Sequence, residues 1–458
     1  MPEQSEAPSA ETTFSIWRDA RRARKQGPAA IEARQRRRLG EMVRYARRHS
    51  AFYAELYRDV PEDVDDSAVL PITSKQQLMA RFDDWVTDPD VKHADVRAFV
   101  AEPTKIGERY LAKYTVATTS GTTGIPGIFL MDDRSMSVTS ALAAGMLMSW
   151  LHLRDVWRIA VRRGRMSMIM ASGGHYASTV AAARLRKSRG KRLQVLSSDT
   201  PIHELVNRLN EFQPALLAPY ASIASLLATE QDSGRLHIAP VLMALSAEGL
   251  APSEYDRIAA AFDTTVGNSY AATECPFLSY GCPERWLHVN ADWVAFEPVD
   301  ADYRPTPRGE PSHTVLISNL ANRIQPILRY DLGDGIVVRP DPCPCGNPLP
   351  AIRVQGRAGD VLRLTAADGR RVAIPPLALD LDDVPGVELF QIAQTSVTAL
   401  EVRLSLSPGA DQNATWRTMR SRLATVLTGY GLAEVTIALA DGPPQMTKGG
   451  KHRAVIPL

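Results

Sequence analysis

The residue types in one short segment, 118–127, suit the binding of a phosphate group. The segment reads TTSGTTGIPG and follows a β-like stretch at 113–117. Backbone N–H groups and hydroxyls gathered in one turn can surround an anion, and glycines let the main chain approach it closely. The segment is not a Walker loop, because Gly121 is followed by Pro126 where that loop has Gly-Lys-Ser/Thr. Composition alone leaves an ordinary surface loop rich in Ser, Thr and Gly equally open.

A second set of residues has the chemistry of a zinc site. It consists of Cys282, His288, Cys343 and Cys345. Cys-x-Cys followed by glycine forms a tight knuckle, and Cys₃His is a ligand set that Zn²⁺ accepts in tetrahedral structural sites. The spacing is not that of a standard zinc finger, and buried free cysteines are common, so unligated thiols are the alternative. Zinc here would be structural, holding a Pro-rich loop that has little apolar material.

The bulk composition indicates a soluble, cytoplasmic protein of more than one domain. A chain of 458 residues is too long for one compact core. A net charge of +2 gives no reason to expect nucleic acid or a membrane as partner. The first 13 residues lack the apolar core of a signal peptide. The most apolar stretch, 138–153, is too short to cross a bilayer and is expected to form a buried helix.

The N-terminal region carries several runs of arginine. Residues 1–12 have the composition of a disordered tail, and 14–57 reads as helix with a break at Gly27 and Pro28. Binding of nucleic acid through these arginines is one interpretation. The other is a pair of packed helices with solvated arginines, because an apolar stripe lies between the runs. That stripe comprises Ile31, Leu39, Met42, Val43 and Tyr45.

The middle of the chain alternates short β-like runs with helical ones, which predicts α/β layers with a largely parallel sheet. The expected strands are 158–161, 193–197, 215–218 and 241–246, and the expected helices are 202–211 and 223–227. Beyond Val294 the sequence is rich in β-formers and proline. We expect a large N-terminal domain, 13–359, with mixed or parallel sheets and helices, and a small α+β domain, 360–458.

Five segments in register resemble the adenylate-forming superfamily of acyl-CoA synthetases, peptide-synthetase adenylation domains and luciferases. The first is the phosphate-loop run, TSGTTGIP. The others are NSYAATE, similar to the adenine-stacking motif, RYDLGD, GRAGD at the hinge, and MTKGGKHR near the C-terminus; they span 268–274, 329–334, 356–360 and 446–453. The length, the basic N-terminus and the Cys-Pro-Cys-Gly segment are most similar to the phenylacetate–CoA ligase branch. The sequence departs from the superfamily pattern at Gly127, where a lysine is usual, at Ala271 or Ala272, and at Gly359.

The resemblance implies an enzyme that activates a small acid with ATP, releases pyrophosphate and passes the acyl group to an acceptor. Coenzyme A is the acceptor that the branch implies, and a polar cluster in the expected pocket favours an aromatic acid. Two alternatives keep the adenylation step: transfer to an amine, and activation of nitrite for diazotisation of an arylamine. The partners would then be a small-molecule acid and acceptor, with no nucleic acid. The oligomeric state is open, with a homodimer as one option.

The matched positions imply a role for each nucleotide-binding residue. Tyr270, with Ala271 and Thr273 beside it, would face the adenine. Asp334 would accept the ribose hydroxyls, and Arg357 would pair with phosphate or ribose. The residues of the loop that would hold the phosphates are Thr119, Ser120, Gly121, Thr123 and Gly124.

The catalytic residues implied are Lys451, Glu274 and Thr122. Lys451 would bring positive charge to the carboxylate, and Glu274 would hold Mg²⁺ with Thr122 or the next threonine nearby. Lys448 competes with Lys451, which we prefer because it follows glycine and precedes Arg453 at the expected spacing. The segments expected to line the acyl pocket contribute His175, Tyr176, Glu248 and Asn268.

Overall fold

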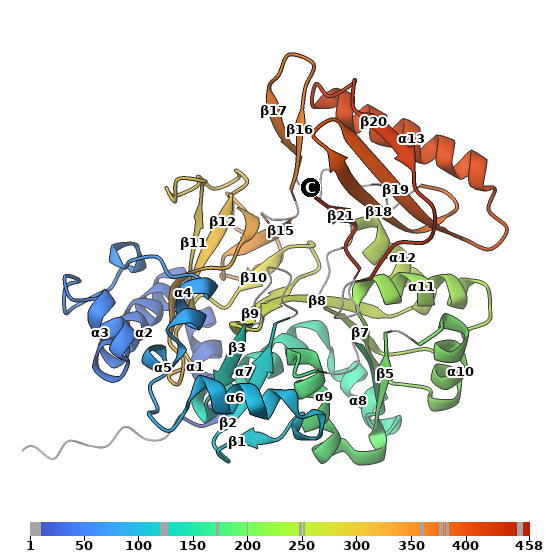
Figure 1. The fold of residues 1–458 in the computed structure, drawn as a ribbon. Helices are drawn as coiled ribbons and strands as arrows, with labels where there is room; N and C mark the ends of the chain where they lie inside the picture. The colour runs from blue at the N-terminus through green and yellow to red at the C-terminus, as the bar shows by residue number, and fades with distance from the viewer. Residues whose placement is uncertain are drawn as a thin grey trace, which may run out of the picture.

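The chain folds into an N-terminal helical region, a large central sheet and a separate C-terminal unit (Figure 1). The computed structural model describes residues 11–119, 127–170, 174–198, 200–246, 250, 252–357, 361–374, 379, 381, 384–446 and 452–458. The expected disordered tail falls mostly on residues 1–10, which lie outside the described residues.

The N-terminal region is helical, as predicted. Thr12 caps α1 with its side chain, and Gly27, at a φ of 91°, turns the chain between α1 and α2. Pro28 then occupies the first position of α2, where its missing N–H costs nothing. The helices are α1 (Thr13–Gln26), α2 (Pro28–His49), α3 (Ala51–Leu56), η1 (Ser67–Val69), α4 (Lys75–Ala80), α5 (Phe82–Trp85), α6 (His93–Ala101) and η2 (Pro103–Lys105).

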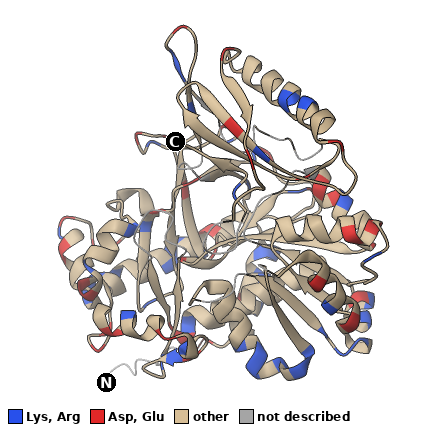
Figure 2. Ribbon diagram, turned by 45° about the vertical axis from the view of Figure 1, so that its right-hand side comes forward, with Lys and Arg blue, Asp and Glu red and all other residues tan. Residues whose placement is uncertain are grey.

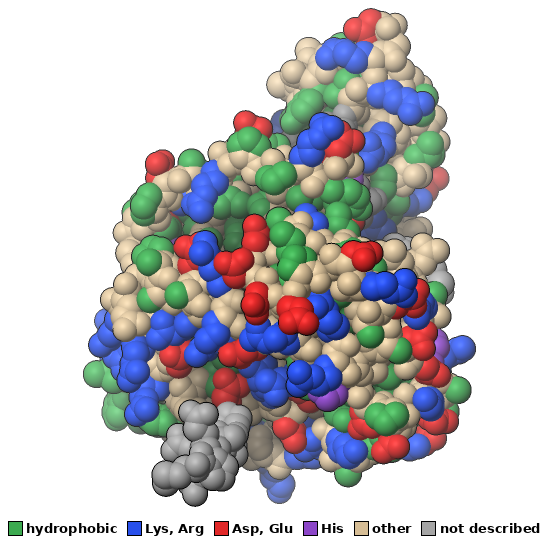
Figure 3. Space-filling view, turned by 90° about the vertical axis from the view of Figure 1, so that its left-hand side faces the viewer, with side chains coloured by type: hydrophobic (Ala, Val, Ile, Leu, Met, Phe, Trp, Pro, Cys, Tyr) green, Lys and Arg blue, Asp and Glu red, His purple; other side chains and the backbone are tan. Residues whose placement is uncertain are grey.

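Several of the N-terminal arginines are used inside the protein. Arg38 is buried, lies 3.6 Å from the ring centroid of Trp293, and pairs with Asp19 at 2.8 Å and Asp292 at 3.4 Å. Arg34 pairs with Asp19 at 3.0 Å. On the face that the N-terminal helices present, Lys and Arg are interspersed with Asp and Glu (Figure 3). These contacts favour the interpretation of packed helices over that of a nucleic-acid surface.

A nine-stranded sheet forms the centre of the protein. Its five strands from β5 to β8 run parallel, and its strands from β8 to β14 run antiparallel. The predicted α/β arrangement with a largely parallel sheet is therefore confirmed for this half of the sheet. In sheet order the strands are β14 (Asp334–Val338), β15 (Ala351–Arg357), β10 (Leu287–Val289), β9 (Cys275–Gly281), β8 (Thr265–Ala272), β7 (Leu242–Leu245), β6 (Leu216–Ala218), β4 (Met166–Met170) and β5 (Leu193–Ser197).

Helices cover both faces of the parallel strands. One face buries apolar side chains of α10, α11 and α12, and Trp150 at the end of α7 packs against the other. The helices are α7 (Asp133–Trp150), α8 (Leu153–Val161), α9 (Ala177–Arg189), η3 (Gly190–Arg192), α10 (Ile202–Phe212), α11 (Ala221–Asp232) and α12 (Pro252–Phe262).

Two sequence expectations in this region were wrong. The segment 158–161, expected as a strand, is the end of helix α8. Its Ile and Val favour strands, but Asp155 and His152 close a capping box that starts a helix. The apolar run 138–153 is not one buried helix either, because α7 ends at Trp150 and Leu153 starts α8 with a 91% exposed side chain.

Smaller sheets complete the fold. One contains β1 (Arg109–Tyr110), β2 (Tyr114–Thr118) and β3 (Ile128–Met131), and another β11 (Val294–Val299), β12 (Thr314–Asn319) and β13 (Ile327–Asp331). The C-terminal unit has a core of its own, built from residues between Leu362 and Val455. It contains β16 (Leu362–Thr365), β17 (Arg371–Ile374), β18 (Val387–Ser396), β19 (Ala399–Leu406), α13 (Gln412–Gly429), β20 (Thr436–Leu439) and β21 (Val455–Ile456). The small α+β unit is as predicted.

Among the described residues, no single helix has the length and apolar character needed to cross a membrane; α7 and α8 reach that composition only as a pair, bent by 105°. Acidic and basic residues both occur along the N-terminal helices, around the central sheet and in the C-terminal unit (Figure 2).

Candidate active site

The phosphate-loop segment connects two strands of a β-hairpin. β2 and β3 pair antiparallel, with Thr118 opposite Ile128. Above that pair, the Thr119 N–H donates to the Gly127 carbonyl at 3.0 Å, and the Gly127 N–H donates to Thr119 Oγ1 at 2.8 Å. These two bonds close the neck of the loop. The other predicted phosphate ligands, Ser120, Gly121, Thr122, Thr123 and Gly124, lie outside the described residues.

Three of the predicted nucleotide-binding positions come together from different strands. The Tyr270 hydroxyl, on β8, donates to Asp334 Oδ2 at 2.5 Å, and Asp334 is 8% exposed at the start of β14. Across the β14–β15 ladder, Asp334 stands opposite Arg357. Ala271 and Thr273 follow Tyr270 into the irregular connection to β9. Tyr270 and Asp334 are 64 residues apart in sequence, and the fold brings them together.

Glu274 is a buried carboxylate in this group. Its side chain accepts a hydrogen bond from the Tyr330 hydroxyl at 2.9 Å, and its carbonyl accepts one from Asn319 Nδ2 at 2.9 Å. Burial raises the pKa of Glu274, and the nearby Asp334 carboxylate raises it further, while Lys75 acts in the opposite direction. Burial and the Glu274 charge likewise raise the pKa of Tyr330, so this phenol stays protonated.

The donor chemistry at Glu274 fits Mg²⁺, which prefers hard oxygen ligands and is bound by one or two carboxylates together with substrate phosphates. The pKa of Glu274 is raised by burial and by a second acidic group, so a cation at this carboxylate would relieve an unfavourable charge. Glu274 is therefore the side chain that would hold the ion.

Lys75 is a functional candidate that sequence reasoning missed. The segment before α4 pairs with β13: Thr73 donates to the Arg329 carbonyl, and Asp331 donates to the Thr73 carbonyl at 2.9 Å. This pairing brings the Lys75 side chain next to Gly127 at the loop neck and within electrostatic range of Glu274. The pointer in the sequence was Gly127, which stands where the superfamily that the chain resembles usually has a lysine.

Gly127 cannot carry a side chain in this fold. A Cβ there would lie 2.6 Å from the Phe129 ring and 3.3 Å from Cδ of Lys75. The space next to the loop neck is therefore already filled, in part by the aliphatic stem of Lys75. A side chain at position 127 would therefore require the buried Phe129 ring to shift.

Asn268, expected in the acyl pocket, lies level with the carboxyl end of the parallel strand β7, and open α/β sheets bind ligands at the carboxyl ends of their strands. Asn268 is paired with Leu245, and its Nδ2 donates to the Tyr255 hydroxyl at 3.2 Å. Its side chain also fills the space over Gly281, where a Cβ would come within 1.8 Å of Oδ1. Glu248 lies outside the described residues.

His175 and Tyr176 flank the phosphate-loop hairpin. The His175 carbonyl accepts from the Thr118 N–H at 2.6 Å, and Tyr176 precedes α9. The His175 ring is 2% exposed and lies 5.6 Å from the Phe99 ring, centroid to centroid. Burial lowers its pKa, so the ring is neutral. This position suits support of the hairpin more directly than contact with a substrate.

Lys451, with Lys448, lies outside the described residues, but the segments on either side are placed. Met446 and His452 form an isolated antiparallel bridge, and a His452 ring nitrogen is 2.8 Å from the Phe390 carbonyl on β18. Gln391 donates to the carbonyls of Gln445 and Arg453. The residues on either side of 447–451 are therefore held against β18 of the C-terminal sheet.

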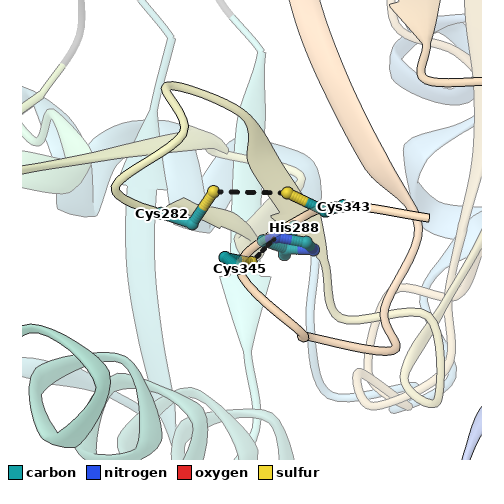
Figure 4. Close-up of side chains that lie close together, drawn as sticks. All are labelled: Cys282, His288, Cys343 and Cys345. Atoms are coloured by element: carbon teal, nitrogen blue, oxygen red, sulfur yellow. Dashed lines mark hydrogen bonds between the residues drawn. The ribbon is translucent and has the colours of Figure 1, made fainter. Parts of the chain in front are cut away.

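The cysteine and histidine residues expected to bind zinc also come together (Figure 4). The side-chain ligand atoms of Cys282, His288, Cys343 and Cys345 all lie within 4.8 Å of one another. They come from the end of β9, from β10 and from the loop before β15. This cluster is the second candidate site.

No protein-family model matches the chain, and no curated protein matches it in sequence. Solved structures match it in fold. A 2-hydroxyisobutyryl-CoA ligase in the postadenylation state, in complex with 2-HIB-AMP, superposes with a TM-score of 0.63 at 21% identity, over 100% of this chain and 95% of that one. The anthranilate CoA ligase AuaEII, in complex with anthranoyl-AMP, gives 0.53 at 16% identity over 74% and 64% of the two chains. The amide bond synthetase McbA from Marinactinospora thermotolerans gives 0.51 at 14% identity over 74% and 67%. The chain therefore has the fold of the adenylate-forming CoA ligases, as its five motifs predicted.

Proposed function

We propose that the protein is an AMP-forming ligase that adenylates a small carboxylic acid and transfers the acyl group to coenzyme A. One observation carries the proposal: Tyr270 and Asp334, 64 residues apart in sequence, are hydrogen-bonded, and the buried Glu274 carboxylate lies close enough to Asp334 for the two charges to interact. Aromatic, ribose-binding and cation-binding groups beside a phosphate loop are the parts that ATP requires. The fold shared with adenylate-forming ligases supports the same chemistry.

In the first half-reaction, a carboxylate oxygen of the acid attacks the α-phosphorus of ATP, and the bond to pyrophosphate breaks. Two anions must approach, so positive charge has to be brought between them. Asp334 holds the ribose and Tyr270 orients the adenine. Mg²⁺ at Glu274 would neutralise phosphate oxygens. Lys451 supplies a charge at the carboxylate, worth about 3 kcal/mol or a hundredfold in rate.

In the second half-reaction, the thiol of coenzyme A attacks the acyl carbon, AMP leaves with the bonding pair, and the thiol proton passes to solvent. The same site serves both steps if the C-terminal unit, 360–458, swings about Asp360 and takes Lys451 away. Arg357 lies directly before this hinge and acts on the nucleotide as the unit docks.

Transfer to an amine is a second candidate, and the fold shared with the amide synthetase McbA favours it. An aromatic acid is our preferred first substrate, and the fold shared with the anthranilate ligase supports that choice. Both candidates predict AMP and pyrophosphate; they differ in the acceptor.

Pyrophosphate release tests the proposal. The purified protein would be incubated with MgATP and a panel of aromatic and short hydroxy acids, and with nitrite plus arylamines, each with and without coenzyme A. We expect release with one acid, AMP as co-product and faster turnover with coenzyme A. Turnover stimulated by an amine instead would select the amide-forming reaction. Absence of pyrophosphate with every acid would refute adenylation by this site.

A matched pair of variants links the activity to the site. Asp334→Ala removes the ribose carboxylate and should lose nucleotide-dependent turnover. Asp300→Ala changes an aspartate in an exposed turn, where it accepts hydrogen bonds from Asp302 and Arg304, and should keep it. Equal activity of the two variants would place the reaction elsewhere.

A further inference from the structure

We propose that Cys282, His288, Cys343 and Cys345 bind one structural Zn²⁺ that ties the β9–β10 hairpin to the loop before β15. Three thiols and one imidazole approach from two chain segments that are separated by about sixty residues in sequence. Soft sulfur with imidazole nitrogen is the donor set of structural zinc, and four such groups complete its tetrahedron.

The spacing of the ligand atoms matches a tetrahedral ion. With Zn–S bonds of about 2.3 Å, two thiolates on one tetrahedral zinc lie about 3.8 Å apart. Cys282 Sγ and Cys343 Sγ are 3.8 Å apart, and His288 Nε2 is 3.2 Å from Cys345 Sγ. A disulfide needs about 2.05 Å between the sulfurs, so the geometry favours a shared ion over a bond.

The histidine is oriented as a zinc ligand would be. His288 Nδ1 lies 2.9 Å from the Leu349 carbonyl, which can only accept, so Nδ1 carries the proton. The Nε2 lone pair is then directed at Cys345 and the other sulfurs. Fixing one ring nitrogen on a backbone carbonyl is the way in which metal-bound histidines are held. The ring is fully buried on β10, so water does not replace this bond.

The surroundings can accommodate the charge of such a site. Zn²⁺ with three thiolates and a neutral imidazole carries one net negative charge. Arg24 lies 5.6 Å from the ring centroid of Tyr280, which in turn is 6.3 Å from the His288 ring. Arg339 and Arg353 lie over the Trp286 ring at 5.1 and 4.2 Å. Trp286 packs in the same small cluster as Cys343, so positive charge is close on two sides.

The site is structural rather than catalytic. Its own apolar cluster is small, with Trp286, Cys343 and Ala351 as buried members, so the loop needs another source of stability. Cys282 follows the last residue of β9, and Glu274 precedes the first. At about 3.3 Å per residue, the seven-residue strand separates the two sites by about 23 Å. A metal ion here would stabilise the ends of β9 and β10 and the loop before β15, and it would not contact the reacting groups.

Metal analysis of the full-length protein tests the proposal. We expect one zinc per chain by elemental analysis, loss of zinc in Cys343→Ser and His288→Ala, and its retention in Cys275→Ala. Cys275 is the matched control, because it is buried and outside the cluster. Replacement by Co²⁺ should give the intense visible bands of a tetrahedral thiolate site.

Removal of zinc with a chelator should lower the melting temperature, and readdition of Zn²⁺ alone should restore it. Should a ligand variant fail to fold, cobalt titration of the chelated wild-type protein still gives the stoichiometry. A metal content near zero, four titratable thiols whether or not Zn²⁺ is added, or zinc retained by the His288→Ala and Cys343→Ser variants would each overturn the proposal.

A different observation carries a second proposal, which rests on the proposed function. We infer that Lys75 supplies the phosphate-neutralising charge that the loop lacks at Gly127. Gly127 has no room for a side chain, and the stem of Lys75 occupies the adjoining space. Lys75 also acts electrostatically on Glu274, the side chain that would hold Mg²⁺. Lys75 therefore lies next to the loop neck and within electrostatic range of Glu274, where its charge could offset that of a bound phosphate.

Two things hold α4 in this position. Thr73 is bonded to β13 on both sides, and its hydroxyl donates to the Leu328 carbonyl at 2.9 Å. Met79, one turn beyond Lys75, contacts the Ile128 N–H through its sulfur at 3.4 Å. The helix therefore spans from the Tyr330 strand to the exit of the loop, and Lys75 lies between them.

Nucleotide binding and kinetics together test Lys75. Lys75→Met should weaken MgATP binding by about tenfold or more in calorimetry and raise the KM for ATP, with the KM for the acid unchanged. Lys75→Arg should recover most of the affinity, and Lys191→Met, at an exposed lysine, should behave as wild type. An unchanged ATP affinity in folded Lys75→Met would refute the role. If the wild type released no pyrophosphate, the proposed function would be refuted. The MgATP affinity of Lys75→Met relative to wild type, measured by calorimetry, would still test the role of Lys75.

Discussion

Replacing Glu274 by glutamine should raise stability and abolish activity in one change. The carboxylate is 9% exposed, and burial raises its pKa in the folded protein above the ordinary value of 4.5. The folded state then binds this proton more tightly than the unfolded state, so folding stability falls as pH rises from 4.5 towards the raised pKa. Above that window the carboxylate costs about 1.4 kcal/mol for each unit of elevation.

Glutamine removes this cost and keeps an oxygen that can accept from Tyr330. Each kcal/mol gained should raise the melting temperature of a protein of 458 residues by about 1 °C, and the gain should appear at pH 8 and vanish near pH 4. Adenylation should fall about 10²–10³-fold, because glutamine is a poor ligand for Mg²⁺ and offsets no phosphate charge.

Thermal melts across pH and pyrophosphate release measure the two effects. The control is Glu297→Gln, which removes a half-buried ion pair with Arg329 at 3.1 Å and should lower stability at neutral pH. If Glu274→Gln were less stable than wild type at pH 8, the attraction of Lys75 for the carboxylate would outweigh the cost of burying its charge, and the reasoning would be refuted. If it adenylated at the wild-type rate, Glu274 would have no part in binding the metal.

Three further outcomes follow from the same contacts. Asp334→Asn should raise the KM for ATP about thirtyfold, from loss of about 2 kcal/mol of charge-assisted hydrogen bonding to ribose. Lys451→Ala should lower the adenylation rate at least a hundredfold while calorimetry shows ATP binding retained. Lys448→Ala should keep both the adenylation rate and ATP binding. Arg38→Met should cost about 3–5 kcal/mol in urea unfolding, because it leaves the buried Asp292 charge unpaired, and adding Asp292→Asn should recover part of that loss.

The sequence predicted the elements whose signal is local. The strand at 193–197 and the helix at 202–211 were located to within one residue, since each has its own periodicity and boundary. The strand predicted at 158–161 is wrong, because its β-branched residues favour a strand while the capping residues His152 and Asp155 start a helix. Propensity over four residues is weaker than a cap that decides where a helix begins.

The site was predictable where a motif marks the residue and not where the fold alone creates the contact. Asp334 and Tyr270 stand in recognisable segments and are hydrogen-bonded to each other, while their roles towards a nucleotide stay predictions. Lys75 stands in no motif, and its proximity to Glu274 depends on the pairing of Thr73 with Tyr330, more than 250 residues apart. A pairing between distant segments has no periodicity in the sequence. The absence at position 127 of the lysine usual in the resembled superfamily was the one feature that suggested a lysine from another segment.

β15 connects the two candidate sites. The loop before this strand carries Cys343 and Cys345, and the last residue of the strand, Arg357, stands opposite Asp334. A strand transmits its register, because a slip of one residue turns every side chain to the other face. A zinc ion before the start of β15 would therefore fix the register of this strand against β10 and against β14 as far as the shift between Ile336 and Gly335. Loss of the metal should then weaken ATP binding in proportion to the disorder of β15, and leave the hairpin at Thr119 and Gly127 unchanged.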